Sequence, residues 1–269
     1  MNSRQSDLVR IEAALHVAGE ILARFQSGNV ASTHKSNLDP VTEADLAVDH
    51  ALRDLLVCDD EAWLSEETAD DHVRLDAARV WVVDPLDGTK EFVEGLPEWC
   101  VSIGLVEDGR AVAGGIFNPD TGFLAVGAQG EGCRLNGELV TVSACSMLPS
   151  ALVLASRSEV RRGQWKRWDD SEVEVEAMGS VAYKLARVAC GLADATWTLV
   201  PKHEWDVAAG VALINAAGGW ARNLHGEAPR FNQPHPWLSG LIAAGPGLSQ
   251  WLTPEFLLEG DTVDAVTPH

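Results

Sequence analysis

The chain has 269 residues, and its 40 Asp and Glu against 20 Lys and Arg give a formal net charge of −20. With 46% hydrophobic and 22% charged residues, the composition is that of a globular protein, which excludes disorder over most of the chain. The negative charge argues against partners that need a positive surface, namely nucleic-acid polymers and anionic membranes, but it permits a small phosphorylated substrate held through metal ions. We interpret the acidity as an aid to solubility, with adaptation to a saline habitat as the alternative.

Cysteine usage and the first residues bear on the compartment. The five cysteines are odd in number and form no C-x-x-C pair, so neither a disulfide framework nor a structural zinc site is expected. Residues 1–7 are polar and lack the pattern of a signal peptide, and no run of about 18 apolar residues occurs. We therefore expect a cytoplasmic protein in a reducing environment.

Two helices are predicted near the start of the chain. Apolar residues recur at helical spacing from Ser6 or Asp7 onward, and Gly28 provides a stop. The segment Thr42–Asp45 resembles a capping box that opens a second helix. A helix cap is therefore the simplest interpretation of Asp45 if it is taken alone.

Strands follow. The run Val80–Val83 predicts a buried strand that ends in a turn at Asp84-Pro85. Apolar runs separated by turn residues predict an antiparallel meander over 101–106, 111–117 and 123–126, and a hairpin over 134–142 turns at Asn136-Gly137.

Beyond Pro149 strand-like and helix-like runs alternate. The predicted strands cover 152–155, 195–200 and 241–244, and the predicted helices cover 181–190 and 207–217. We therefore expect an N-terminal α+β lobe over residues 1–148 and a C-terminal α/β lobe over residues 149–269. The short end over 261–268 is expected to fray.

Acidic clusters stand out at the ends of predicted elements: Asp39 to Asp45, Glu66-Glu67, Asp84 to Asp87, and Glu204 to Asp206. In the third, a strand delivers Asp84 to the sheet edge and Asp87 follows closely enough to face the same metal ion. Gly88 then allows a close backbone approach, and a helix that begins near Thr89 would favour a phosphate beside these two residues.

These acids also have other interpretations. The D-x-D-x-T loop of haloacid-dehalogenase phosphatases is excluded, because Leu86 stands where that motif needs its second Asp. Any one of the acids alone is more simply a solvated turn or a helix cap. Together, carboxylates without nearby histidine or thiolate ligands favour Mg²⁺ over Zn²⁺.

Two motifs carry a resemblance to a known family. The segments Asp84-Pro-Leu-Asp-Gly-Thr89 and Trp205-Asp-Val-Ala-Ala-Gly210 resemble those of the inositol monophosphatase superfamily, which includes 3'(2'),5'-bisphosphate nucleotidases and relatives of fructose-1,6-bisphosphatase. The match extends in order from Lys35 to about Gly219. It implies a layered α/β fold, an αβαβα sandwich of the inositol monophosphatase and fructose-1,6-bisphosphatase type, together with a lithium-sensitive phosphatase activity and a homodimer.

The resemblance also implies residue roles. The N-terminal lobe would carry most of the ligands for two or three Mg²⁺ ions, with the last Asp supplied by the C-terminal lobe. The implied metal ligands are Glu66, Asp84, Asp87, Asp206 and the backbone carbonyl of Leu86. The implied catalytic residues are Asp45, Thr89 and Glu66, of which Asp45 pairs with Thr89 to orient or deprotonate the attacking water. Phosphate is assigned to Gly88 and Thr89, and substrate binding to Asp87, Gly179 and Ser180.

Substrate choice depends on finer details. Inositol monophosphatases place a Glu seven residues before the motif Asp, where this chain has Leu199. The segment Thr89–Phe92 and the Glu204 that precedes Trp205-Asp206 look more like the bisphosphate nucleotidases, although Lys90 is equally explained as a solvated side chain. Ser180 is either a residue that meets the leaving group or an ordinary helix N-cap.

We therefore expect Mg²⁺-dependent hydrolysis of a small phosphomonoester. The first choice is the 3'-phosphate of adenosine 3',5'-bisphosphate, and the rival substrate is inositol monophosphate. A hypothesis of another class is a metal-responsive binding module without turnover.

Overall fold

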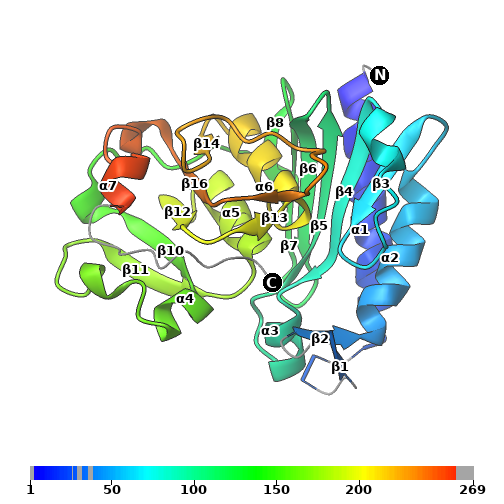
Figure 1. Ribbon diagram of the computed structural model, residues 1–269, viewed down its shortest axis with the longest axis horizontal. Coiled ribbons are helices and arrows are strands. Elements are labelled where there is room, and N and C mark those ends of the chain that lie inside the picture. Colours follow the sequence, from blue (N-terminus) through cyan, green and yellow to red (C-terminus); the bar gives the residue numbers. More distant parts are fainter. Residues whose placement is uncertain (1–2, 26, 29–31, 36–38, 259–269) are drawn as a thin grey trace.

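The computed structural model describes residues 3–25, 27–28, 32–35 and 39–258, and for 32–35 and 39–42 it describes the backbone alone. Helices and sheets alternate in layers (Figure 1), which is the predicted αβαβα sandwich. Among the described residues no helix is both long and apolar enough to cross a membrane. The end predicted to fray, 261–268, lies outside the described residues.

The larger sheet has seven strands that lie side by side in chain order. All neighbours are antiparallel except the first two, which are parallel. The predicted meander and hairpin are confirmed, and Asn136 and Gly137 have the positive φ angles, 49° and 88°, that a tight hairpin turn requires. The strands are β3 Glu61–Ser65, β4 Arg79–Asp87, β5 Cys100–Glu107, β6 Arg110–Asn118, β7 Phe123–Ala128, β8 Gly132–Leu135 and β9 Glu138–Val140. A separate hairpin consists of β1 Ser32–Lys35 and β2 Asp39–Thr42.

Helices α1 Ser3–Leu22 and α2 Glu43–Leu56 cover one face of this sheet. Side chains alternate along β4, so that Trp81 and Val83 pack with Leu15 and Leu52 of the two helices, while Val82 faces the opposite side. The first helix extends further toward the N-terminus than predicted and ends before Gly28.

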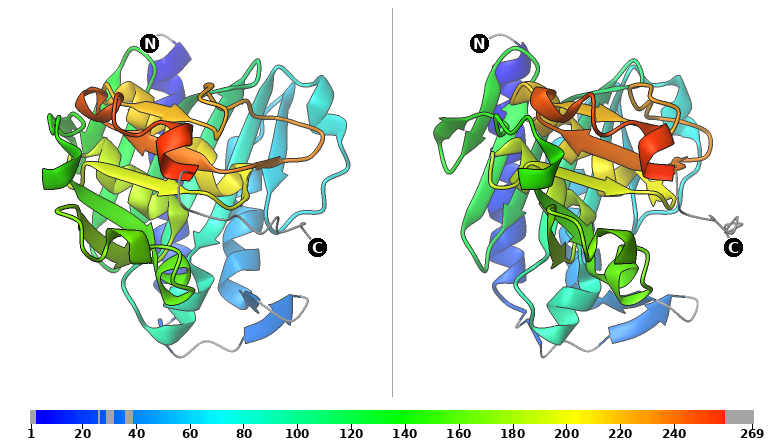
Figure 2. Two further views of the ribbon diagram at one scale, coloured as in Figure 1. Left: turned by 60° about the vertical axis from the view of Figure 1, so that its left-hand side comes forward. Right: turned by 90° about the vertical axis from the view of Figure 1, so that its left-hand side faces the viewer.

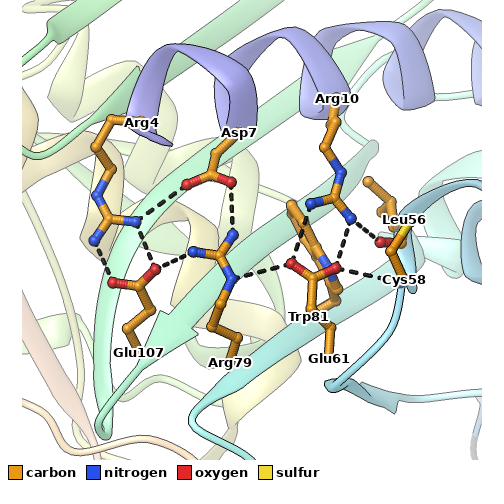
Figure 3. Close-up of polar contacts among 9 residues, drawn as sticks. All are labelled: Arg4, Asp7, Arg10, Leu56, Cys58, Glu61, Arg79, Trp81 and Glu107. Atoms are coloured by element: carbon orange, nitrogen blue, oxygen red, sulfur yellow. Dashed lines mark hydrogen bonds and ion pairs between the residues drawn. The ribbon is translucent and has the colours of Figure 1, made fainter. Parts of the chain in front are cut away.

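Charged side chains also tie α1 to the sheet (Figure 3). The guanidinium of Arg79 donates to Asp7 at 2.6 Å and to Glu61 at 3.0 Å, and Arg10 of α1 binds the same Glu61. Glu107 accepts from Arg4 and Arg79. The network therefore joins one helix to three neighbouring strands.

Helices α5 Val181–Ala189 and α6 Glu204–Ala216 fill the middle layer between the two sheets. The second lies so close to the larger sheet that a Cβ placed on Gly114 would sit 2.7 Å from the carbonyl oxygen of Ala209. Glycine at this position thus sets the depth at which α6 packs on the sheet.

The smaller sheet has five strands in the order β11 Glu174–Met178, β10 Leu152–Ser156, β12 Ala195–Thr198, β16 Leu241–Ala244 and β14 Trp220–Arg222. Its inner face packs on the middle helices, and its outer face carries Trp197, which stacks on Trp165 with 4.7 Å between ring centroids. Helix α4 Arg157–Arg161 follows β10 directly, and α7 Pro254–Leu258, drawn red in Figure 2, lies against the outer face. Short strands β13 Lys202–His203 and β15 Trp237–Leu238 pair with each other. The lobe boundary at residues 148 and 149 stays a prediction.

Candidate active site

Parallel pairing of β3 with β4 brings two acids to one edge of the larger sheet. Ser65 of β3 is paired with Val83 of β4, so the next residues on the two strands, Glu66 and Asp84, lie side by side. Strand β3 was not predicted from the sequence. The pairing of β3 with β4 therefore explains why Glu66 and Asp84 lie close together, which residue spacing alone did not show.

The predicted turn at Asp84-Pro85 is wrong, because β4 continues to Asp87. Asp84 pairs with Ser102 and Asp87 with Cys100, which leaves an extra residue on β4 and forms a bulge between the two acids. Proline has no N–H to give to the ladder, and the amide of Leu86 turns inward to donate to Oδ1 of Asp84 at 3.0 Å. The bulge lets both acids leave the strand near one point.

The predicted acids gather around Asp84, which is 2% exposed. Its pKa is raised well above the usual value by burial first, then by the negative charges of Glu66, Asp87, Asp206 and Asp45. Burial and the charge of Asp87 likewise raise the pKa of Asp206 to about 7. The structure thus brings together the five acids that the sequence predicted.

This cluster suits a hard cation. Carboxylates that share a buried site repel one another, and a divalent ion bound by oxygen ligands offsets that repulsion. Within the described residues, no three acidic, histidine or cysteine side chains stand close enough to hold one ion without some rearrangement. The metal prediction is therefore supported by the charge and chemistry of the cluster rather than by a finished coordination sphere.

Asp206 reaches the cluster from the first turn of α6. Its Oδ2 accepts the backbone N–H of His203 at 3.0 Å, which satisfies a donor that the start of the helix leaves unpaired. The ring of His203 stacks on Trp205 with 4.3 Å between centroids. Capping and stacking together hold the helix start beside the acids.

Asp87 is bound by the start of α5. Its Oδ2 accepts the hydroxyl of Ser180 and the backbone N–H of Ala182, each at 2.6 Å. The same hydroxyl accepts the N–H of Tyr183 at 3.0 Å, so Ser180 is an N-cap as well as a partner of the predicted ligand. The N–H of Gly179 donates to Oε2 of Glu98 at 2.7 Å.

The predicted phosphate loop begins a short helix, α3 Thr89–Glu94. Gly88 has a φ of 96°, and a Cβ there would lie 2.9 Å from the carbonyl oxygen of Glu98, so glycine is required. The hydroxyl of Thr89 donates to the Leu86 carbonyl at 3.0 Å, the carbonyl predicted to bind metal. Asp45, on α2, is buried and near enough to act on Asp84, and its pairing with Thr89 stays a prediction.

A cleft of about 400 Å³ joins these residues. Its walls carry the acids Glu66, Asp84, Asp87 and Asp206 together with Gly88, Thr89, Gly179 and Ser180, and basic side chains from Lys90, Arg157, Arg161, Lys184 and Lys202. A larger hollow of about 600 Å³ between β6, α6 and residues 228–231 contains none of the acids. Glu67, Glu91 and Glu94 line it as well, so the cleft combines a negative cluster with basic and acidic side chains around it.

Two residues on which the substrate prediction depends, Glu204 and Leu199, are not among those that line the cleft. Glu204 is fully buried, and its carboxylate accepts the backbone N–H groups of Asn232 at 2.7 Å and Gln233 at 2.9 Å. Leu199 packs on the outer core of the smaller sheet. Glu204 therefore anchors a loop, and its likeness to nucleotidases does not reflect a contact in the cleft.

Sequence reasoning missed residues that support the site. Asp49 of α2 is buried and accepts the hydroxyls of Ser65 and Thr68, the second at 2.7 Å, on either side of Glu66. Its position four residues after Asp45, on the same helix face, was the available signal. Arg157, which lines the cleft, binds Glu98, a contact between distant segments that no local pattern indicates.

Comparisons with known proteins agree with this geometry. The sequence profile of the inositol monophosphatase family matches residues 3–259. Inositol monophosphatase 2 of Solanum lycopersicum is 36% identical over 226 residues, which cover 78% of this chain and 84% of that protein. The crystal structure of the extragenic suppressor protein SuhB from Bartonella henselae aligns with a TM-score of 0.81 at 26% identity, covering 95% of this chain and all of that one. CysQ from Bacteroides thetaiotaomicron, described as a bacterial member of the inositol monophosphatase family, aligns with a TM-score of 0.76 at 28% identity, covering 90% and 98%.

Proposed function

The chain belongs to the inositol monophosphatase family of phosphatases, and from that membership we propose that it hydrolyses small phosphomonoesters with metal-activated water, preferring the 3'-phosphate of adenosine 3',5'-bisphosphate. The observation that carries the proposal is the shared cleft, which four of the predicted acids line together with basic side chains, while Asp45 lies near enough to act on Asp84. Acids of this kind hold cations, and the basic side chains offer a place for a second anionic group.

The chain's own residues divide the chemistry among them. Glu66, Asp84, Asp87, Asp206 and the Leu86 carbonyl would hold Mg²⁺, as two or three ions. When bound, Mg²⁺ supplies Lewis acidity toward a water and positive charge toward the phosphoryl group. Asp45 and Thr89 orient the attacking water, the Asp45 carboxylate accepts its proton, and the amides near Gly88 and Thr89 hold phosphate oxygens. No covalent phosphoenzyme forms.

The preference for a bisphosphate rests on the basic side chains of the cleft. Lys90, Arg161 and Lys202 line it and could neutralise a second phosphate group. The likeness to CysQ points the same way. Inositol-1-phosphate is the second candidate, because the tomato relative is named an inositol monophosphatase.

Three substrates compared at fixed Mg²⁺ test the proposal. We expect kcat/KM for adenosine 3',5'-bisphosphate to exceed that for inositol-1-phosphate and fructose-1,6-bisphosphate at least tenfold, which corresponds to about 1.4 kcal/mol of transition-state binding. Lithium should inhibit the reaction. A preference for the inositol ester supports the second candidate, and no turnover of any of the three supports a binding module without catalysis.

We also propose a compartment and an oligomeric state for the protein. All five cysteines are free thiols, which supports a reducing compartment such as the cytoplasm. A homodimer is proposed from family likeness. Light scattering during gel filtration measures the mass directly, and a monomer at micromolar concentration would contradict the dimer.

A further inference from the structure

Lys184 is a buried cation in the wall of the cleft, with 4% of its surface exposed. Its Nζ donates to the carbonyl of Ser180 at 2.8 Å and makes longer contacts with the carbonyls of Gly179 at 3.4 Å and Met178 at 3.5 Å. An ammonium group has three donors and no acceptor. The ammonium group thus contacts three consecutive backbone carbonyls at the end of β11.

These carbonyls belong to a turn that needs support. Ser180 has a φ of 48°, in the left-handed region that is unfavourable for residues other than glycine. Carbonyl oxygens that converge on one point also repel one another unless a donor lies between them. Lys184 supplies that donor from the second turn of the helix that the turn begins.

The same turn holds Asp87. The hydroxyl of Ser180 and the N–H of Ala182 both bind its Oδ2 at 2.6 Å. A connected path of hydrogen bonds therefore runs from the Lys184 ammonium, through the backbone of residues 178–180, to the carboxylate of Asp87.

We propose that Lys184 is a positioning residue that fixes the turn at residues 178–180 and thereby aims the carboxylate of Asp87 at the metal site. This positioning role rests on the proposed function, in which Asp87 is a Mg²⁺ ligand. The role is distinct from that of a substrate ligand, because the donors of Lys184 are directed at the backbone.

A positioning role and a purely electrostatic role for Lys184 predict opposite changes in Mg²⁺ affinity when this lysine is removed. Lys184 is near enough to Asp87 and Asp206 for their charges to interact. If charge alone mattered, removal of this cation would strengthen Mg²⁺ binding, because a repulsion would be lost. If Lys184 positions Asp87, its removal weakens Mg²⁺ binding, since contacts that orient metal ligands commonly contribute 10-fold or more to affinity.

The experiment measures Mg²⁺ binding by calorimetry without substrate in the wild type, K184M and K184Q, alongside the Mg²⁺ concentration for half-maximal activity. Both variants are neutral and of similar length, but only glutamine retains an N–H donor for the carbonyls. We expect the dissociation constant to rise about tenfold in K184M and clearly less in K184Q. Lys202→Met removes a neighbouring charge from the same cleft and should not weaken Mg²⁺ binding.

Binding in K184M that equals or exceeds that of the wild type overturns the proposal, as does equal weakening in K184M and K184Q. A wild type that binds no Mg²⁺ contradicts the proposed function instead, so the two failures differ. Thermal unfolding checks that each variant folds. If K184M does not fold, Ser180→Ala removes the last hydroxyl of the same path, and unchanged Mg²⁺ affinity in that variant overturns the proposal.

Discussion

The carboxylate of Asp87 and the hydroxyl of Ser180, which lie 93 residues apart in the chain, are joined by a hydrogen bond of 2.6 Å. The first residue ends the bulged strand β4, and the second caps α5. One contact therefore links the acid cluster to the helix layer between the sheets. A movement of α5 relative to the larger sheet would therefore shift the carboxylate of Asp87 at the proposed metal site.

Asp87→Asn should abolish most of the phosphatase activity. The change removes a negative ligand and places an amide beside two donors that need an acceptor, so we expect kcat/KM to fall at least 100-fold at saturating Mg²⁺. The exposed Asp170→Asn serves as the control and should retain wild-type activity. Wild-type turnover by Asp87→Asn would show that the metal assignment is wrong.

Thr89→Ala should act mainly on kcat. Its hydroxyl donates to the Leu86 carbonyl, and Thr89 is proposed to orient the attacking water, so kcat is expected to fall by roughly 10² while KM changes little. Thr89→Ser keeps the Oγ atom and should retain most of the rate. An unchanged kcat in the alanine variant removes Thr89 from the mechanism.

Gly114→Ala should disturb the site from a distance. The added Cβ meets the carbonyl oxygen of Ala209 at 2.7 Å and pushes α6, which carries Asp206, away from the sheet. We expect a loss of about 1–3 kcal/mol in the free energy of unfolding, together with lower activity.

Gly122→Ala is the matched comparison for that change. Gly122 has a φ of 67°, so alanine there is also strained, but no atom lies within 4 Å of the new Cβ. This variant should lose stability and keep its activity at temperatures where it is folded. Equal activity in the two variants would show that the depth of α6 does not matter for the site.

Acid should weaken the network around Glu61. Burial alone raises the pKa of this side chain, but hydrogen bonds from Arg10, Trp81 and Arg79 outweigh it and lower the pKa to about 2, against 4.5 in the unfolded chain. A lowered pKa contributes stability that is present above pH 4.5 and is lost as the pH falls through 2.

The measurement is the free energy of unfolding of the wild type and Glu61→Gln between pH 6 and pH 2.5. The difference between them should be greatest at pH 6 and shrink below pH 4.5. Exposed Glu138→Gln should show little difference at any pH. A difference for Glu61→Gln that stays constant with pH would contradict the assigned pKa.

Much of the fold was predictable, because local patterns carry it. Alternating apolar residues and turn residues such as Asn136-Gly137 indicated the meander and hairpin, and helical spacing indicated both middle helices. Several strands were not predicted from the sequence, among them β3 and β11. Both lie at sheet edges and are largely half-buried or exposed, so their sequences lack the apolar pattern that marks a strand.

The sequence by itself determined the family to which this protein belongs, the acids of the two motifs and much of the alternation of helix and strand. Only the tertiary structure decided how these residues are held. The β4 bulge depends on pairing with β5, and the contact from Asp49 to Thr68 depends on α2 packing beside β3. Lys184 acquires its place because α5 turns its side chain back onto three carbonyls. Hydrogen bonds between distant segments form only after the layers pack, so residue spacing along the chain does not predict them.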